Sequence, residues 1–344
     1  MPVTIKDIAR LAVVSHTTVS RALRDHPAIA PDTTARIKQI AQVQGYLPSA
    51  VARGLKTRRS KVLGVIVSAI DDPFWSEVLQ GIDDSLHPAG YSLYVVASHR
   101  EKEREGQIVR SMVEQRVDGV ILCSPIFSDD QVHLLQSYGL PAIAVNNSGA
   151  EGFSCSIFND NPFGVSALTR HLLELDHRRI AYLGNQRGGR TNRDREEAFR
   201  AELSAAGVAI QPDFVYAAPS SFPSGGFSGA QHFLNLPERP TAIFCYNDYM
   251  AVGVYSALYQ AGLRIPEDIS VVGFDNITIA AYMIPALTTF HQPKHSLGAE
   301  TARIMLYLLN AAPGGETTPM TESIPNTIKM RGELRVRAST ARLH

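Results

Sequence analysis

The most constraining feature of the sequence is a series of short apolar runs that begins at Val62. The runs are continuous rather than alternating, and amphipathic stretches with Gly, Pro, Asn or Asp at their borders separate them. Continuous apolar strands that alternate with helices are typical of parallel sheets built from βαβ units. The first series reads VLGVIVSA, YSLYVVAS, GVILCS and PAIAVN, and the second reads SCSIFND, RIAYLGN, TAIFCYN and ISVVGFDN. One compact sheet does not hold so many strands, so we predict an α/β body of two doubly wound lobes.

The length and composition indicate a soluble protein of several domains. At 344 residues the chain is too long for one small core. No apolar run reaches the roughly 18–20 residues that a membrane span requires, and the start MPVTIKDIAR lacks the apolar segment of a signal peptide. The three cysteines are widely spaced, so we expect buried free thiols rather than a disulfide framework. We therefore expect a cytoplasmic protein that does not contact membranes.

Charge is distributed unevenly along the chain. Residues 1–61 hold eleven Lys and Arg but only three Asp, a net charge of +8, whereas the remainder carries −8. A basic segment on an acidic body is the expected footprint of a polyanion-binding domain. A solubilising charged tail would lack the apolar periodicity of this segment. Nucleic acid is therefore the predicted partner.

The basic segment contains the pattern of a helix-turn-helix unit. Thr4 with Asp7 resembles a capping box, and Ser15 with Thr18 provides a second N-cap. A third helix is expected after Pro31, a favourable first-turn residue. The bend of about four residues between the first two helices has helix-turn-helix spacing, in which the second helix enters the major groove.

The second helix carries side chains suited to DNA. Small polar groups can bond to phosphates or base edges without filling the groove, and an arginine can bind guanine through two hydrogen bonds. The predicted DNA-contacting residues of this segment are Thr4, Ser15, His16, Thr17, Ser20 and Arg21.

Two segments, VTIKDIARLAVVSHTTVSRAL and GYLPSAVARGLKT, resemble the amino terminus of the LacI/GalR family of lactose and galactose repressors. The resemblance continues through nearly the whole chain. It implies a DNA-binding head at 1–47, a hinge at 48–61 and an effector-binding body at 62–344. For the body it implies lobe 1 at about 62–159 and 291–322, lobe 2 at about 160–290 and 323–344, and crossings near Asn159, Phe290 and Ser323.

The resemblance also assigns a role to the hinge. In this family the segment folds when two copies meet over the minor groove, where a leucine inserts between bases. By position that leucine is Leu55, and Ala52 helps to pair the two helices. Apolar side chains inserted in this way kink DNA. With Gly54 inside it, so short a helix is not expected to persist alone in water.

One position departs from the family at the bend of the head. Relatives usually read Ala-Gly-Val-Ser, whereas this chain has Val13 in place of the glycine. If that residue has a positive φ, a β-branched side chain costs about 1–3 kcal/mol of strain. We therefore predict a head that is less stable than those of its relatives.

Ligands of doubly wound sheets bind beyond the carboxyl ends of the strands, which here face the cleft between the lobes. The stretch DDPFW follows the first strand, where the two rings form either core or a stacking platform. The resemblance implies effector contacts at Phe74, Asn146, Arg195, Asn247 and Asp275, with Gln292 and Phe222 as weaker matches. Strand ends add further candidates, so that the predicted effector set is Asp72, Phe74, Trp75, Ser124, Asn146, Arg195, Phe222, Asn247, Asp275 and Gln292.

The types of these residues favour a sugar. Arg, Asp and Asn supply the donors and acceptors that adjacent hydroxyls need, and aromatic rings cover the apolar face of a sugar ring. Asn146 stands where relatives often have Asp, which changes the hydroxyl pattern that fits. Arg195 is expected just before a helix that runs toward Leu203. The alternative ligand is a purine stacked on Phe74 and Trp75.

Other chemistry finds no support in the sequence. His291 and His295 have metal-like spacing, but Pro293 interrupts them and no third ligand is near. There is no nucleophile elbow, phosphate-binding loop or dinucleotide motif. We therefore expect neither an enzyme nor a cofactor.

Together these observations predict a LacI-type repressor of carbohydrate-related genes. It would act as a homodimer or a dimer of dimers on a pseudo-palindromic operator, and a mono- or disaccharide in the cleft would relieve repression. The alternatives are a regulator co-repressed by a purine or another small molecule and, with less support, a sugar-binding protein without DNA function.

Overall fold

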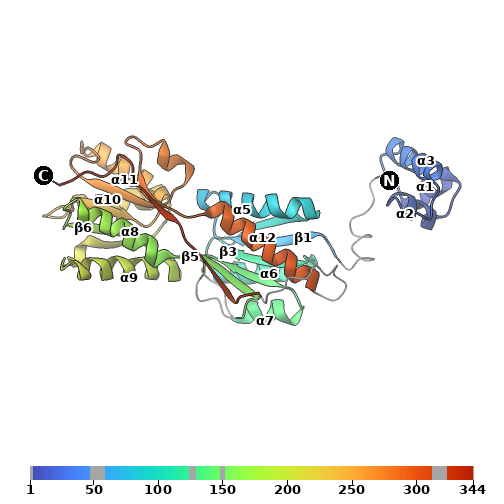
Figure 1. Ribbon diagram of the computed structural model, residues 1–344, viewed down its shortest axis with the longest axis horizontal. Helices are drawn as coiled ribbons and strands as arrows, with labels where there is room; N and C mark the ends of the chain where they lie inside the picture. The colour runs from blue at the N-terminus through green and yellow to red at the C-terminus, as the bar shows by residue number, and fades with distance from the viewer. Residues whose placement is uncertain (1–2, 47–58, 124–128, 148–151, 312–323, 344) are drawn as a thin grey trace. The chain divides into compact units, whose positions relative to one another are not determined.

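The computed structural model describes residues 3–46, 59–123, 129–147, 152–311 and 324–343 (Figure 1). The chain divides into two compact units, Met1–Ser60 and Lys61–His344. Among the described residues no helix combines the length and apolar character needed to cross a membrane. The three cysteines are buried free thiols, as predicted.

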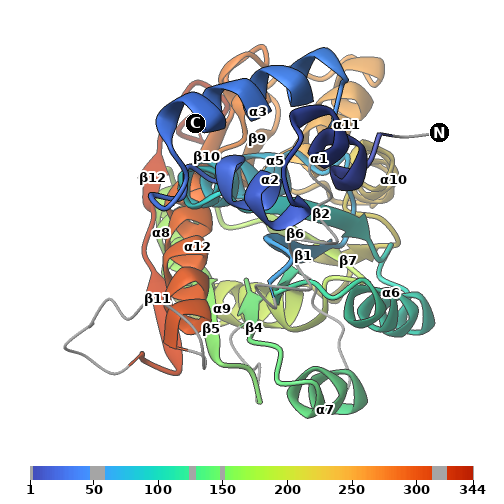
Figure 2. The same ribbon diagram turned by 90° about the vertical axis from the view of Figure 1, so that its right-hand side faces the viewer.

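The first unit is a three-helix head (Figure 2). Its helices are α1 (Ile5–Ala12), α2 (His16–Ala22) and α3 (Pro31–Val43). They bury Ile8, Val19 and Ile37 in one small core. The predicted capping box of Thr4 is present at α1, and Ser15 caps α2 by accepting a hydrogen bond from the backbone N–H of Thr18.

The bend between α1 and α2 contains a strained valine. Val13 has a φ of 52° and a ψ of 47°, so the left-handed conformation on which the predicted strain depends is present. The N–H of Val14 donates to the carbonyl of Ala9, and the Arg36 guanidinium donates to the carbonyl of Ala12. These bonds satisfy the last carbonyls of α1. The Val13 side chain is 88% exposed, so its packing does not repay the strain.

Lobe 1 of the body is a six-stranded parallel sheet with helices on both faces. Its strand order is β11-β5-β4-β3-β1-β2, and α5 and α12 cover one face while α6 and α7 cover the other. The elements are β1 (Val62–Val67), α5 (Pro73–Leu86), β2 (Ser92–Ala97), α6 (Lys102–Glu114), β3 (Gly119–Cys123), α7 (Asp129–Ser137), β4 (Ala142–Val145), β5 (Cys155–Asn159), α12 (Lys294–Ala311) and β11 (Thr327–Met330).

Lobe 2 repeats this architecture. Its strand order is β12-β10-β9-β8-β6-β7; β12 is antiparallel to β10, α8 and α9 cover one face, and α10 and α11 cover the other. The elements are α8 (Asn161–Glu174), β6 (Ile180–Asn185), α9 (Gly189–Ala205), β7 (Val215–Ala218), α10 (Pro223–Leu234), β8 (Ala242–Cys245), α11 (Asp248–Gln260), β9 (Ser270–Asp275), β10 (Thr288–His291) and β12 (Glu333–Arg335). Short 3₁₀ helices cover His87–Ala89, Pro212–Phe214 and Thr278–Ala281.

The chain passes between the lobes after β5, after β10 and after β11. The third crossing differs from the prediction at Ser323, because Thr327–Met330 pairs with β5 of lobe 1 and the chain crosses only afterwards, before Glu333. The sequence reading missed β11 because this edge strand is half polar and has no continuous apolar run.

Two glycines let α5 and α12 pack backbone to backbone in lobe 1. A Cβ on Gly81 would lie 2.1 Å from the carbonyl oxygen of His295, and a Cβ on Gly298 would lie 2.0 Å from that of Val78. Real side chains do not approach carbonyls so closely. The two helices are therefore expected to move as one body.

Replacing Val13 by glycine should stabilise the head. Glycine adopts a positive φ without strain, and the exposed valine loses little packing, so we expect the unfolding free energy to rise by about 1 kcal/mol. Thermal and urea unfolding of residues 1–60 measures this. Val43→Gly is the matched control, because that valine is also exposed but helical, and there glycine should destabilise. An unchanged or lower stability of Val13→Gly would contradict the strain.

Candidate functional site

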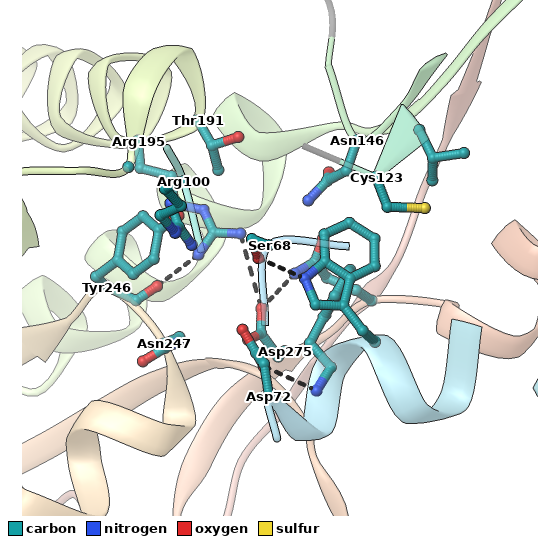
Figure 3. Close-up of a pocket in the computed structure, with 15 residues that line it drawn as sticks. Ser68, Asp72, Arg100, Cys123, Asn146, Thr191, Arg195, Tyr246, Asn247 and Asp275 are labelled. Carbon is teal, nitrogen blue, oxygen red and sulfur yellow. Dashed lines mark hydrogen bonds and ion pairs between the residues drawn. The ribbon is translucent and has the colours of Figure 1, made fainter. Parts of the chain in front are cut away.

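A pocket lies between the two lobes at the carboxyl ends of their strands (Figure 3). The first lobe contributes residues that follow β1, end β3 and follow β4, and the second contributes residues that follow β8 and end β9. The lining residues are Ser68, Asp72, Phe74, Trp75, Arg100, Cys123, Val145, Asn146, Gly188, Thr191, Arg195, Tyr246, Asn247, Asp275 and Gln292.

The first turn of α5 forms the aromatic wall of the pocket. Asp72 caps the helix by accepting a hydrogen bond of 3.1 Å from the N–H of Phe74. The indole N–H of Trp75 donates to Ser68 at 3.0 Å. The Phe74 and Trp75 rings meet edge to face, with centroids 4.9 Å apart and planes at 87°. The two rings thus form a corner rather than a slot with parallel walls.

Arg195 supplies the buried cation of the pocket. The sequence reading placed it before a helix, but α9 already begins at Gly189, so Arg195 lies inside the helix. The side chain is almost fully buried, and its guanidinium donates to Asn161 at 2.9 Å and to the carbonyl of Tyr246. It also lies 3.9 Å from the centre of the Phe274 ring.

Asp275 faces Arg195 from the end of β9. Its carboxylate lies 3.7 Å from the guanidinium and accepts a hydrogen bond from the Gln292 amide (Figure 3). Burial raises the pKa of Asp275 well above its ordinary value, although the Arg195 charge opposes that rise. Burial also raises the pKa of Asp72. Two desolvated carboxyls therefore share the region of one guanidinium.

Two further amides leave acceptors without partners. The Oδ1 of Asn146 and the Oε1 of Gln292 are buried and have no hydrogen-bond partner among the described residues. Asn146 has a φ of 58°, a left-handed conformation that asparagine tolerates. Because an unpaired buried acceptor is costly, the pocket is suited to a ligand that donates hydrogen bonds.

Most of the predicted effector residues come together in this pocket. Phe222 lines an adjoining cavity, which shares Ser68 and Arg100 with the first, and Ser124 lies outside the described residues. Asn247 caps α11, because its side-chain oxygen accepts a hydrogen bond from the N–H of Met250 at 2.8 Å. The predicted residues that line the pocket are Asp72, Phe74, Trp75, Asn146, Arg195, Asn247, Asp275 and Gln292.

The sequence reading missed several lining residues. Ser68, Cys123 and Tyr246 directly follow or end strands, so the rule for strand ends could have identified them. Thr191 lies one turn before Arg195 on α9, and helical spacing could have placed both on one face. Arg100 follows β2 in a loop, and it reaches across the cleft to donate to the carbonyl of Arg187 at 2.6 Å, which no sequence pattern predicts.

In the head, the side chains predicted to contact DNA differ in how far they are already engaged. His16, Thr17 and Arg21 are exposed on α2, whereas Thr4 and Ser15 bond to backbone N–H groups as caps. Ser20 receives hydrogen bonds from Arg24 on both its carbonyl and its hydroxyl. The two predicted hinge contacts, Ala52 and Leu55, lie outside the described residues.

The histidines with metal-like spacing have other partners. His295 pairs with Asp84 at 3.0 Å, and His291 bonds to the Asn276 amide at 3.1 Å. Within the described part of the chain, no group of three or more His, Cys, Asp or Glu side chains is arranged to hold a metal ion.

Comparisons with known proteins agree with this geometry. Residues 4–49 match the model of bacterial regulatory proteins of the lacI family, and residues 169–340 match a periplasmic binding protein-like domain. The chain is 34% identical to the ribose operon repressor of Escherichia coli K12 and 33% identical to the transcriptional repressor PurR of Aliivibrio salmonicida. Each alignment covers 88% of this chain, and 92% and 91% of the relatives, respectively. The lac repressor dimer bound to operator and the anti-inducer ONPF is 26% identical, with a TM-score of 0.85 over 99% of this chain and all of that one.

Removing the buried cation should destabilise the body in a pH-dependent way. Arg195→Met removes the cation that pairs with the buried Asp275 carboxylate, so we expect the unfolding free energy to fall by about 3 kcal/mol at pH 7.5. The loss should be smaller at pH 5, where the raised pKa of Asp275 lets it take up a proton. Urea unfolding at both pH values measures this. Arg193→Met, an exposed arginine of the same helix, is the control, and equal losses in both variants would contradict the assignment.

A third buried acid, Asp248, lies at the start of α11, directly after the pocket residue Asn247. Asp248 accepts from the Ile277 N–H at 2.9 Å and from the Thr289 hydroxyl, and burial raises its pKa to about 6. An acid whose folded pKa is raised stabilises the fold less as pH increases from the unfolded pKa through the folded one.

Asp248→Asn should therefore flatten the pH dependence of stability. Between pH 5 and pH 7.5 the wild type should lose about 1 kcal/mol that the variant does not lose. Because both proteins contain the same histidines, the difference between their unfolding free energies at each pH reports the titration of Asp248 alone. Parallel curves for the two proteins would contradict a raised pKa of Asp248 in this pH range.

Proposed function

Because the chain belongs to the lacI family of bacterial regulatory proteins, a family of transcription regulators rather than enzymes, we propose that this DNA-binding repressor is released from its operator by a sugar. The sugar would occupy the pocket between the lobes. Its binding would change the relation of the lobes and so the geometry of the paired hinges. By linkage, operator DNA would change the affinity for the sugar by the same factor.

The observation that carries the sugar assignment is the polar inventory of the pocket. The Arg195–Asp275 pair offers a donor and an acceptor side by side, as neighbouring hydroxyls require. The unpartnered oxygens of Asn146 and Gln292 can accept further hydrogen bonds, and the hydroxyls of a polyol can donate them. The corner of Phe74 and Trp75 can cover the apolar face of a sugar ring.

For the DNA, we propose that two heads of a homodimer bind the half-sites of a pseudo-palindromic operator. The exposed His16, Thr17 and Arg21 would reach base edges, and the residues that cap or brace the helices would contact phosphates. The lac repressor relative is described as a dimer bound to operator, which supports this stoichiometry. Ala52 and Leu55 of two chains would then meet in the minor groove.

A purine is the second candidate, because a relative with 33% identity is named as the repressor PurR. A purine stacks best against a flat wall, whereas Phe74 and Trp75 meet at 87°. The pocket therefore favours a sugar. A purine that tightens operator binding would be the opposite outcome of the experiment that follows.

Trp75 is the only tryptophan of the chain and lines the pocket, so its fluorescence reports occupancy directly. We would titrate the full chain with ribose, galactose, glucose, cellobiose, hypoxanthine and guanine. The same ligands would then be added to a complex with DNA from upstream of its gene, followed by anisotropy. One sugar that changes the Trp75 signal and releases DNA supports the proposal. A response to a purine alone would overturn the sugar assignment.

Arg21→Ala should weaken operator binding by about 1–3 kcal/mol and relax the base preference at one position of each half-site. Anisotropy with operators substituted at single positions measures this. Lys38→Ala is the control, because that lysine lies on α3 and pairs with Asp25 at 2.6 Å. A uniform loss across all operator variants would instead make Arg21 a phosphate contact.

A further inference from the structure

Lys294 is a buried cation that the proposed binding of effector does not use. It is only 1% exposed and is the first residue of α12. A cation at a helix N-terminus is disfavoured by the helix dipole, and a buried ammonium is disfavoured by desolvation. Because both effects disfavour a charged lysine at this position, its hydrogen bonds and ion pair must offset them.

The ammonium of Lys294 bonds to groups of both lobes. It donates to the backbone carbonyls of Asp275 at 2.7 Å and Asn276 at 3.0 Å, at the end of β9 in lobe 2. It also pairs with the carboxylate of Glu77 at 3.4 Å, on α5 of lobe 1. The lysine thus connects the lobes beside the second crossing of the chain.

The carbonyls that it binds belong to a strained segment. Asn276 has a φ of 53°, a left-handed conformation that asparagine tolerates, but Asp275 has a φ of 119°, which residues other than glycine rarely adopt. Such a conformation persists only where surrounding bonds hold it. The hydrogen bond from the Lys294 ammonium to the carbonyl of Asp275 is one of these bonds. In this conformation the Asp275 carboxylate contacts Arg195 and Gln292 in the pocket.

The third partner leads to the other wall of the pocket. Glu77 lies one turn beyond Phe74 on α5, whose first turn also carries Trp75. The α5 helix packs against α12 through Gly81 and Gly298 without intervening side chains, so the pair responds as one body. The lysine therefore joins the acidic wall in lobe 2 to the aromatic wall in lobe 1.

We propose that Lys294 is a positioning residue that orients Asp275 for the effector and, through Glu77, transmits effector binding to the helix pair of lobe 1. This inference rests on the proposed function, since it assigns a further role around the same pocket. Its bonds to lobe 2 and its pairing with Glu77 in lobe 1 predict two separable effects. The carbonyl bonds set effector affinity, and the Glu77 pair sets the response of operator binding.

The test uses full-length Lys294→Met, Lys294→Arg and Glu77→Gln. Lys329→Met is the matched control, because Lys329 also pairs with a carboxylate, Asp160 at 3.6 Å, but is largely exposed. Trp75 fluorescence gives the affinity for the sugar that responds in the panel above, and anisotropy gives operator affinity with and without it.

For Lys294→Met we expect at least tenfold weaker sugar binding, with sugar-free operator affinity within threefold of wild type. Lys294→Arg should recover part of this loss. Glu77→Gln should keep sugar affinity within threefold but reduce the effect of sugar on operator binding severalfold, and Lys329→Met should resemble wild type. Wild-type behaviour of Lys294→Met, or equal losses in Glu77→Gln and Lys294→Met, would overturn the inference.

If no sugar of the panel binds the wild type, the proposed function fails, but the connection that Lys294 makes between the two lobes can still be tested. Amide hydrogen exchange without ligand then compares peptides covering 270–280 and 73–86. Faster exchange of both peptides in Lys294→Met, but not in Lys329→Met, would support the connection. Faster exchange of only one of them would overturn it.

Discussion

Burying the Arg195 guanidinium in lobe 2 commits its surroundings to neutralising and bonding it. Asn161 and the carbonyl of Tyr246 accept its N–H groups, and Asp275 opposes its charge. Transferring a charge from water into the protein interior costs free energy, so a buried guanidinium requires partners that the fold holds in place. The pocket of this repressor is therefore preorganised on the side of lobe 2, and the carboxylate that completes it sits on backbone that is itself strained.

The opposite wall is built by different forces. In lobe 1, a proline and the Asp72 cap start α5 so that its first turn presents two aromatic rings to the cleft. Close packing of α5 on α12 makes that wall part of a rigid helix pair. One wall thus depends on electrostatics and the other on packing. A ligand that touches both gains affinity only when the lobes hold both at the right separation, which is the physical requirement for a switch.

The head, in contrast, combines a small core with backbone strain. Its three helices share a small core, and Val13 adds left-handed strain that glycine would avoid. The caps of α1 and α2 and the hydrogen bond from Arg36 to the carbonyl of Ala12 hold the bend in place in spite of this strain. The exposed side chains of α2 remain available for a polyanion, in keeping with the basic charge of residues 1–61.

The sequence by itself determined the α/β class and the helix-turn-helix head from local patterns, and it identified most of the pocket from strand ends together with the family resemblance. Apolar runs mark strands, caps mark helices, and strand ends mark ligand sites. It placed Arg195 before a helix and the third crossing at Ser323, because glycine can begin a helix and a half-polar edge strand carries no clear period. Only the tertiary structure brought Arg100 to the carbonyl of Arg187, and Lys294 to Asp275 and Glu77. Those bonds join residues far apart in the chain, and their partners are set by how the two sheets face each other.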